Sequence, residues 1–312
     1  MLRSGLRRVE TNAGLADEKA LGVGDALAGA RRARERMPSM AELQQIGLRH
    51  PAAELVRDIQ RNRTGIPRRT FVAEGLFENN VVLEAGVTID TFLWCPGAAY
   101  SDEARTRSKQ LAERARRSYR ISEKTLAHLA ERPNPDGLIA IARLPDIDPE
   151  AIAFRKNGLI LVIDGIEIPG NLGTLIRTAD ACAADCLVLT NRRTRLTHPK
   201  VLRSSQGMSV RVPAIEFDEV AGAVAWLGRH AFTVYLADTD DSQNYRSCDY
   251  RGRTALVVGS ERYGISPAWQ QAGFRRIGIP MLGAADSLNV AVSAAVLLFE
   301  ARAQMNQWDK TG

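Results

Sequence analysis

One stretch sets the architecture of the C-terminal half of the chain: Leu159-Ile-Leu-Val-Ile-Asp164-Gly-Ile-Glu-Ile-Pro169-Gly-Asn-Leu-Gly-Thr-Leu-Ile-Arg177. It opens with five apolar residues in a row, which is typical of a strand in a parallel sheet that is covered on both faces. A Pro-Gly turn and a helical segment follow. Further apolar runs predict more strands, with helices between them and a last helix from about Leu288 to Gln304. The strands are expected at residues 186–189, 232–237, 255–258 and 276–279.

Upstream of this stretch the pattern predicts a smaller α/β domain, because strands again alternate with helices. Helices are expected at residues 41–61, 75–85 and 102–118, and strands at residues 70–74, 88–95 and 137–142. Pro145-Asp-Ile-Asp-Pro149 has the composition of a linker. We therefore divide the chain into a basic, flexible tail (1–37), a small domain (38–148), a linker (149–157) and a second domain (158–312).

The composition is that of a soluble globular protein, with 45% hydrophobic and 25% charged residues. No apolar run reaches the length of roughly 18 residues that a membrane-spanning helix needs, and no secretory signal is evident. We therefore expect a cytoplasmic protein. The formal net charge is +6, and all of this excess falls within residues 1–73. A basic excess favours a polyanionic partner such as RNA, because cations that contact phosphates release counterions.

The four cysteines are Cys95, Cys182, Cys186 and Cys248. Their spacing completes no zinc tetrad. We expect buried, reduced thiols and no metal ion.

The first motif with chemical meaning is the segment from Asp164 to Arg177. Pro169-Gly170 forms a turn, and Asn171 is expected to cap the helix that follows. Arg177 would then lie within the first two turns. On a buried helix surface its charge would need an anionic partner, which is either a structural carboxylate or a ligand.

Two more motifs follow strands. Gly259-Ser-Glu261-Arg-Tyr-Gly264 comes after a buried strand, where backbone can approach a ligand closely. Ile279-Pro-Met281 and then Ser287-Leu-Asn289 lead into the last helix. Ser287 and Asn289 are suited either to a ligand or to simple N-capping. The dinucleotide fingerprint G-x-G-x-x-G is absent, which argues against a nucleotide-dependent oxidoreductase.

In this order and spacing, the three motifs resemble those of the SpoU (TrmH-like) family of RNA ribose 2′-O-methyltransferases. The resemblance covers about residues 158–304. The first motif is also similar to that of the actinomycete enzymes that methylate ribosomal RNA and confer resistance to antibiotics of the thiostrepton and avilamycin type. Many family members carry Asn or Asp just before the motif's proline, whereas this chain has Ile168.

The resemblance implies an α/β domain of the SPOUT type with a deep trefoil knot, which is otherwise very rare, and a homodimer formed through this domain. It also implies that residues 38–148 form an L30e-like RNA-binding domain. The cofactor would be S-adenosylmethionine. By the same resemblance, its binding residues would be Leu236, Ala237, Gly259, Ile279 and Leu288.

The implied catalytic residues are Arg177, Asn171, Glu261, Ser287 and Asn289. Arg177 would contact the ribose 2′-hydroxyl and a neighbouring phosphate. A guanidinium remains protonated, so positioning and charge stabilisation suit it better than proton abstraction. Phosphate contacts are expected from five further arginines: Arg61, Arg63, Arg68, Arg69 and Arg203.

These features predict methyl transfer to a ribose 2′-hydroxyl, with 23S ribosomal RNA as the favoured substrate and antibiotic resistance as one biological role. Two alternatives stay open. The chain could be a tRNA ribose methyltransferase of the same family, or a non-catalytic protein that binds RNA or assists ribosome assembly. Intact motif residues favour the enzyme. Site choice on RNA depends on shape and loop accessibility, which no short motif encodes.

Overall fold

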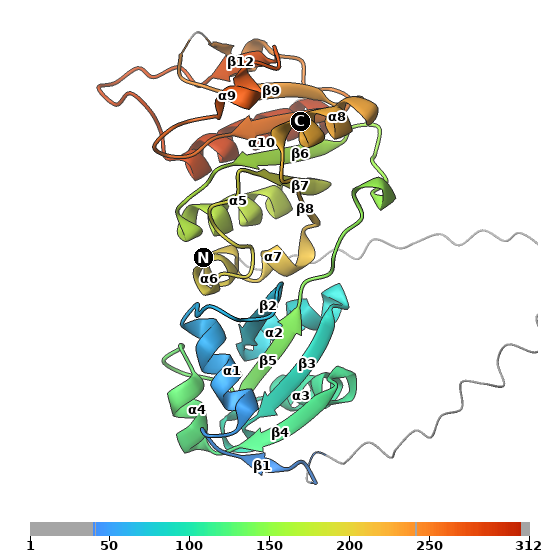
Figure 1. Ribbon diagram of the computed structural model, residues 1–312, viewed down its shortest axis with the longest axis vertical. Coiled ribbons are helices and arrows are strands. Elements are labelled where there is room, and N and C mark those ends of the chain that lie inside the picture. Colours follow the sequence, from blue (N-terminus) through green and yellow to red (C-terminus); the bar gives the residue numbers. More distant parts are fainter. Residues whose placement is uncertain (1–39, 41, 241, 307–312) are drawn as a thin grey trace, which may run out of the picture. The chain divides into compact units, whose positions relative to one another are not determined.

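The computed structural model describes residues 40, 42–240 and 242–306, and the expected tail of residues 1–37 lies outside them. The elements described below belong to one compact unit. Figure 1 shows two sheets, each with its own helices. None of the helices in these described residues is long and apolar enough to cross a membrane.

The first sheet has five strands in the order β1-β4-β3-β5-β2, and β5 runs antiparallel to both of its neighbours. Its elements are β1 (Gln45–Ile46), α1 (Pro51–Gln60), β2 (Thr70–Glu74), α2 (Gly75–Ala85), β3 (Thr88–Trp94), α3 (Asp102–Arg114), β4 (Arg117–Ile121), α4 (Glu123–Leu129) and β5 (Leu138–Arg143).

The second sheet has seven strands, all parallel, in the order β10-β12-β9-β11-β6-β7-β8. Its elements are β6 (Leu159–Asp164), α5 (Pro169–Ala181), β7 (Cys186–Thr190), α6 (Pro199–Ser205), α7 (Met208–Arg211), β8 (Ala214–Glu216), α8 (Val220–Arg229), β9 (Thr233–Ala237), β10 (Gln243–Asn244), β11 (Thr254–Val258), α9 (Pro267–Gln270), β12 (Arg275–Gly278) and α10 (Val290–Asn306).

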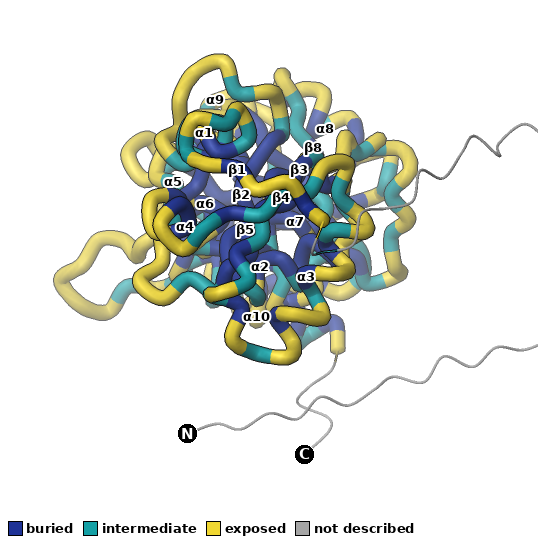
Figure 2. The backbone as a smooth tube through the Cα atoms, turned by 90° about the horizontal axis from the view of Figure 1, so that it is seen from below, coloured by how far each residue is buried: buried dark blue, intermediate teal, exposed yellow. Residues whose placement is uncertain are grey.

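Strand β6 is buried along its whole length, as the apolar run predicts. Its odd-numbered residues pack into a core shared with α5 and α10. Its even-numbered residues, Ile160 and Val162, pack against Trp226 and Trp269 on the other face. Side chains alternate between the two faces of a strand, so helices on both faces require an apolar residue at every position. Figure 2 shows the general pattern, with dark blue, buried segments inside and yellow, exposed loops around them.

The expected strand at residues 70–74 and helix at residues 75–85 are confirmed, and the five strands expected in the C-terminal half are found within two residues of their predicted ends. The helix expected at residues 41–61 is wrong in its first half. There the chain forms β1, and α1 begins only at Pro51. Proline suits a first helical turn because it has no N–H to leave unpaired, and His50 caps that turn by accepting the Ala52 N–H (3.2 Å).

The helix expected at residues 102–118 is also too long. It ends at Arg114, and residues 117–121 form β4, which lies between β1 and β3. Tertiary pairing overrides a weak local preference here.

Helix α5 is held closely on two sides. At Gly173 it approaches α6 so tightly that an added Cβ atom would meet the Ser204 hydroxyl and would lie 2.7 Å from the Val201 carbonyl oxygen. At its C-terminal end, the buried Arg302 of α10 donates to the carbonyls of Cys182 (2.8 Å) and Ala183 (2.9 Å). A cation at a helix C-terminus satisfies carbonyls that have no partner within the helix.

We predict that Gly173→Ala lowers the free energy of unfolding by about 1–3 kcal/mol, because a methyl group would be forced into a packed helix contact. Gly170→Ala is the matched control in the same helix, since nothing lies within 4 Å of its added Cβ atom. Urea denaturation followed by circular dichroism measures both. Equal midpoints for the two variants would contradict the prediction.

Candidate active site

A buried carboxylate organises the edge of the second sheet where its parallel strands end. Asp164, the last residue of β6, is only 2% exposed. It accepts hydrogen bonds from the Thr190 hydroxyl (2.8 Å), the Asn191 amide (2.7 Å) and the backbone N–H of Ser266 (2.7 Å). These bonds tie the loop after β11 to the ends of β6 and β7. The sequence reasoning did not single out Asp164, although a charged residue ending a wholly apolar strand is a usable signal.

The three sequence motifs meet at this edge. The Asn171 side-chain amide donates to the Glu261 carboxylate (2.6 Å), and the Asn289 amide donates to the Asn171 side-chain oxygen (3.2 Å). Asn289 in turn accepts the backbone N–H of Ala291 (2.9 Å), which caps α10. We call Asn171, Glu261 and Asn289 the polar cluster. Its members come from segments about 90 and 118 residues apart in sequence, yet they form one chain of hydrogen bonds.

The expectation that Asn171 caps α5 is wrong. The helix begins two residues earlier, at Pro169, and its N-cap is Ile168, which makes no side-chain capping bond. Proline favours the first helical position, so Asn171 falls inside the first turn. Its side chain is therefore available to bind Glu261.

Arg177 lies further along α5, on a face that also exposes Thr174. The expectation of a buried helix surface is wrong for this chain taken alone, because Arg177 is exposed. Among the residues that the structure describes, no hydrogen bond or ion pair from its guanidinium is found. Ser287 is exposed as well, and its hydroxyl contacts Asp286 (3.1 Å). The contacts of the described residues therefore do not join Arg177 or Ser287 to the polar cluster.

The residues expected to bind the cofactor line up along the same edge. Strands β12, β9 and β11 are neighbours in this sheet. Consequently Ala237 at the end of β9, Gly259 just after β11 and Ile279 just after β12 are brought together. The buried Leu236 precedes Ala237, and Leu288 lies just before α10 and is 39% exposed.

Gly259 shows how closely these loops approach. A Cβ atom added there would overlap the backbone of Gly264 and Ile265, and backbone bonds between Ser260 and Gly264 (2.9 and 3.0 Å) close the loop. Loops of bare backbone suit a ligand that is recognised through N–H and carbonyl groups. The residues present therefore fit an adenosyl cofactor held by backbone contacts.

The five arginines expected to contact RNA differ in their surroundings. Arg61 and Arg68 are exposed, and Arg63 forms an exposed ion pair with Asp58 (2.9 Å). Arg69 is partly buried, pairs with Asp146 (3.2 Å) and donates to the Pro145 carbonyl. Arg203 pairs with Glu131.

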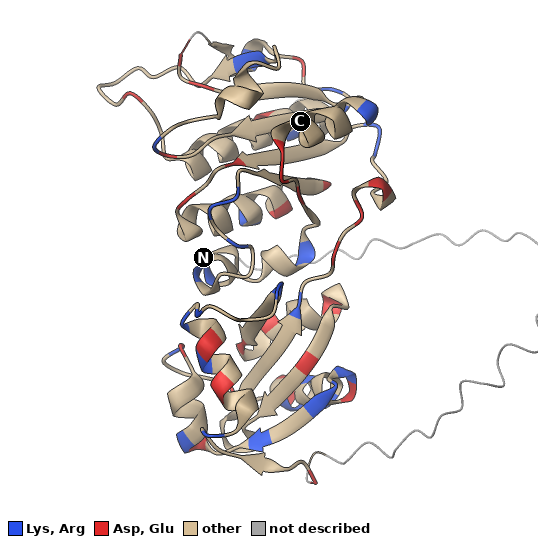
Figure 3. Cartoon of the chain, viewed as in Figure 1, with Lys and Arg blue, Asp and Glu red and all other residues tan. Residues whose placement is uncertain are grey.

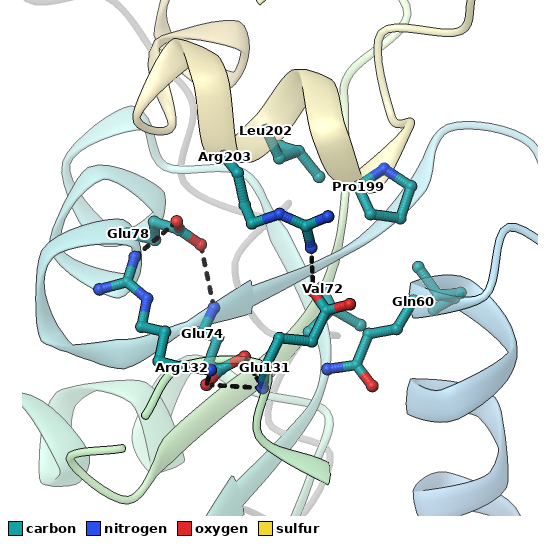
Figure 4. A pocket seen from close by; sticks show the side chains of 10 residues that line it. Gln60, Val72, Glu74, Glu78, Glu131, Arg132, Pro199, Leu202 and Arg203 are labelled. Atoms are coloured by element: carbon teal, nitrogen blue, oxygen red, sulfur yellow. Dashed lines mark hydrogen bonds and ion pairs between the residues drawn. The ribbon is translucent and has the colours of Figure 1, made fainter. Parts of the chain in front are cut away.

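Arg203 also lines the pocket in Figure 4, whose acidic lining residues are Glu74 at the end of β2, Glu78 of α2 and Glu131 after α4. Burial raises the pKa of both Glu74 and Glu78. Glu74 accepts backbone N–H groups of Glu131 (2.9 Å) and Arg132 (3.1 Å), and Glu78 accepts from the Arg132 guanidinium (2.7 Å). These carboxylates are engaged by structural partners. We therefore interpret the charged residues of this pocket as structural ion pairs and hydrogen bonds, one of which holds Arg203, and not as a second reactive site.

All four cysteines are buried and form no disulfide, as expected. Burial raises the pKa of Cys182 to about 11 and that of Cys186 further still, so both thiols stay protonated at neutral pH. In the part of the chain that the structure describes, no three His, Cys, Asp or Glu side chains are grouped as metal ligands would be.

Two family models match the chain. The SpoU rRNA Methylase family model matches residues 158–299, and the MRM3-like substrate binding domain model matches residues 55–140. The first match spans all three motifs, and the second falls within the first sheet and its helices.

Known proteins resemble nearly the whole described region. A 23S rRNA (guanosine(2553)-2′-O)-methyltransferase, RlmP of Bacillus subtilis, is 30% identical over 72% of this chain and 89% of its own length. A 23S rRNA (uridine(2479)-2′-O)-methyltransferase of Streptomyces viridochromogenes is 30% identical over 74% of this chain and 82% of its own.

Among solved structures, the AdoMet-bound rRNA methyltransferase from Sinorhizobium meliloti superposes with a TM-score of 0.75. It is 25% identical and covers 83% of this chain and 97% of its own. The matched family model, the sequence identities and the coverage of both chains lead to one conclusion. This chain belongs to the SpoU rRNA methylase family.

Proposed function

We propose that this protein transfers a methyl group from S-adenosylmethionine to a ribose 2′-hydroxyl of 23S ribosomal RNA. The observation that carries the proposal is the polar cluster, because it unites all three family motifs at one edge of the sheet. The named relatives act on 23S rRNA at 2′-oxygens, and the Sinorhizobium structure is described as AdoMet-bound. Such a substrate places the enzyme in the cytoplasm.

The reaction requires no covalent intermediate with the protein. The cofactor supplies a methyl group that is already activated. The chain must position a 2′-hydroxyl, exclude competing water and assist loss of the hydroxyl proton. We assign positioning of the ribose and its neighbouring phosphate to Arg177, whose guanidinium no group in the described chain engages. Asn171 and Glu261 would orient the substrate, with Ser287 and Asn289 closing the pocket.

Cofactor binding falls to the loops after β9, β11 and β12. We propose backbone contacts at Ala237, Gly259 and Ile279, with Leu236 and Leu288 as apolar walls. The close packing around Gly259 supports this division, because a side chain there would deform the loop. The same loops would form the expected trefoil knot, with the chain returning from β12 to pack α10 on α5.

We further propose that two copies associate through α10. Its outer face exposes Val292 (50%) and Phe299 (44%). These two residues are seven apart in sequence and therefore lie on the same face of the helix. Exposed apolar side chains at this spacing mark an interface. Because α10 packs against α5, a partner on this face would lie close to Arg177. Assembly would then cover the guanidinium that the single chain leaves exposed.

For RNA capture outside the active site we propose the small domain, residues 38–148, as an L30e-like module. Arg61 and Arg68 are its best placed phosphate contacts, because no carboxylate of the described chain pairs with them. Arg63 would have to exchange Asp58 for phosphate. Arg69 and Arg203 are held by structural partners, and we give them a smaller share. A role in antibiotic resistance would follow from the position methylated.

The substrate is tested by supplying tritiated cofactor with unmodified transcripts of 23S rRNA and, separately, of tRNA. We expect label in 23S rRNA alone, at a linkage that resists alkaline hydrolysis because its 2′-oxygen is blocked. Label in tRNA would establish the alternative substrate. No label in any RNA would support a non-catalytic RNA-binding role.

Arg177→Ala is expected to lower turnover by about 10²–10³-fold, the usual effect of removing one charge positioned at a reaction centre. Cofactor affinity, measured by calorimetry, should stay close to that of the unchanged protein. Thr174→Ala, on the same exposed face, serves as the control and should retain activity. Turnover close to normal in Arg177→Ala would remove this residue from the active site.

The double substitution Val292→Asp and Phe299→Asp is expected to yield monomers that methylate RNA poorly, because charges would be placed in an apolar interface. Sedimentation velocity measures the assembly. Phe77→Asp, at an aromatic residue of α2 that is 53% exposed, is the matched control and should leave the assembly unchanged. A double variant that still sediments as a dimer would place the interface elsewhere.

A further inference from the structure

A second group of cations lies in residues 191–200, which comprise the loop that joins β7 to α6 and the first two residues of α6. Buried and exposed residues alternate along it: Thr194 and Leu196 are buried, whereas Arg193 and Arg195 are exposed. Lys200, in the first turn of α6, is exposed as well. Figure 3 shows the positive residues of this loop and of α6 in blue. The alternation turns the cations outward, while their neighbours anchor the loop.

This loop is tied to the edge where the motifs meet. Asn191, at its start, donates to Asp164 (2.7 Å) and to the Ser266 hydroxyl (3.2 Å). The Thr194 hydroxyl donates to the Glu167 carbonyl (2.8 Å), two residues before α5 begins. The loop that carries the cations therefore begins at the same edge of the sheet as Asn171 and Glu261. Its backbone is held in place by these hydrogen bonds.

The charges of three residues in this segment are not neutralised by a carboxylate. Arg192 is excluded, because it pairs with Glu216 and with Asp218 (2.7 Å). By contrast, no ion pair of the described chain involves Arg193 or Lys200, and Arg195 donates to a neutral acceptor, the Asn62 side-chain oxygen. Exposed cations without carboxylate partners remain free for an anion.

His198 lies among these cations, at the start of α6. Its Nδ1 accepts the backbone N–H of Lys200 (3.1 Å), which caps α6. Partial burial lowers its pKa first, and the charges of Arg195, Lys200 and Arg203 lower it further. The imidazole therefore reports the local excess of positive charge.

The contact between Arg195 and Asn62 extends this surface to the first sheet. Asn62 stands between Arg61 and Arg63, two of the arginines already assigned to RNA. Basic groups from the two sheets thus adjoin at one point. A polymer of regularly spaced phosphates can occupy such a continuous row, because it presents one negative charge per nucleotide.

We propose that Arg193, Arg195 and Lys200 form a phosphate-binding strip that holds the RNA backbone between the target nucleotide and the small domain. This strip rests on the proposed function, since it presumes an RNA substrate. It assigns to the catalytic half of the chain a share of the RNA grip that sequence reasoning gave mainly to residues 61–69. Phosphate contacts position the RNA without reading its sequence.

The test variant carries Arg193→Gln, Arg195→Gln and Lys200→Gln. Its matched control carries Lys109→Gln, Lys124→Gln and Lys156→Gln, which removes the same charge from exposed residues that, like those of the test variant, form no ion pair in the described chain. Thermal denaturation verifies that both are folded. The binding probe is a fluorescently labelled polyuridylate, titrated at several salt concentrations.

We expect the test variant to bind polyuridylate at least about tenfold more weakly, with the slope of log affinity against log salt reduced by about 2, since each lost contact to single-stranded RNA removes roughly 0.7. The control variant should keep the slope of the unchanged protein. On 23S rRNA the test variant should show a raised KM and nearly unchanged turnover at saturation.

His198 supplies a second readout by nuclear magnetic resonance, assigned with His198→Gln. Adding polyuridylate should raise the His198 pKa in the unchanged protein, because phosphates offset the cations that lower it. The same addition should move it little in the test variant.

Equal affinity, slope and His198 response in the two triple variants would overturn the strip. That result would leave methyl transfer by the unchanged protein untouched. Conversely, binding losses confined to the test variant would support the strip even if no RNA were methylated, so the two proposals fail separately.

Discussion

Asp164 carries a constraint on which the edge of the second sheet depends. Its carboxylate is buried at the end of β6 and is satisfied by three donors from two other segments. A buried polar group is tolerated only when it is hydrogen-bonded. The requirement therefore fixes where the loops after β7 and β11 can run. Asp164 binds Asn191 at the start of the cationic loop, and it binds Ser266 in the loop that also carries Glu261.

Helix α5, which carries Asn171 and Arg177, is held in place at several points along its length. At its first turn, Asn171 donates to Glu261 and accepts from Asn289; Gly173 packs against α6, and Arg302 binds the carbonyls at the end of the helix. A helix held at both ends and along one side can keep Arg177 in a defined place although that residue is exposed. The position of the polar cluster thus depends on Gly173 and Arg302, which lie outside the cluster.

The cations on the surface are of two kinds: some pair with carboxylates, and others have no carboxylate partner among the described residues. Arg132 pairs with the buried Glu78, and Arg203 pairs with the exposed Glu131, so both arginines are engaged within the structure. Arg193 and Lys200 have no such partners in the described chain. Formal charge along the sequence does not separate these two kinds of arginine. Pairing does, and under our proposal RNA would bind the cations whose charge is still available.

The local sequence pattern was enough to predict several strands and the family of this protein. The unbroken run from Leu159 to Ile163 specified a strand buried on both faces, because every position must be apolar there. Motif order indicates the family, and the sequence predicts Asn171, Glu261 and Asn289 as site residues, which the structure joins by hydrogen bonds. Other features could not be read along the chain. The start of α1 at Pro51, the strand at residues 117–121 and the partners of Arg203 depend on residues distant in sequence. Hydrogen bonds and ion pairs are set by distances in space, which only the packed chain defines.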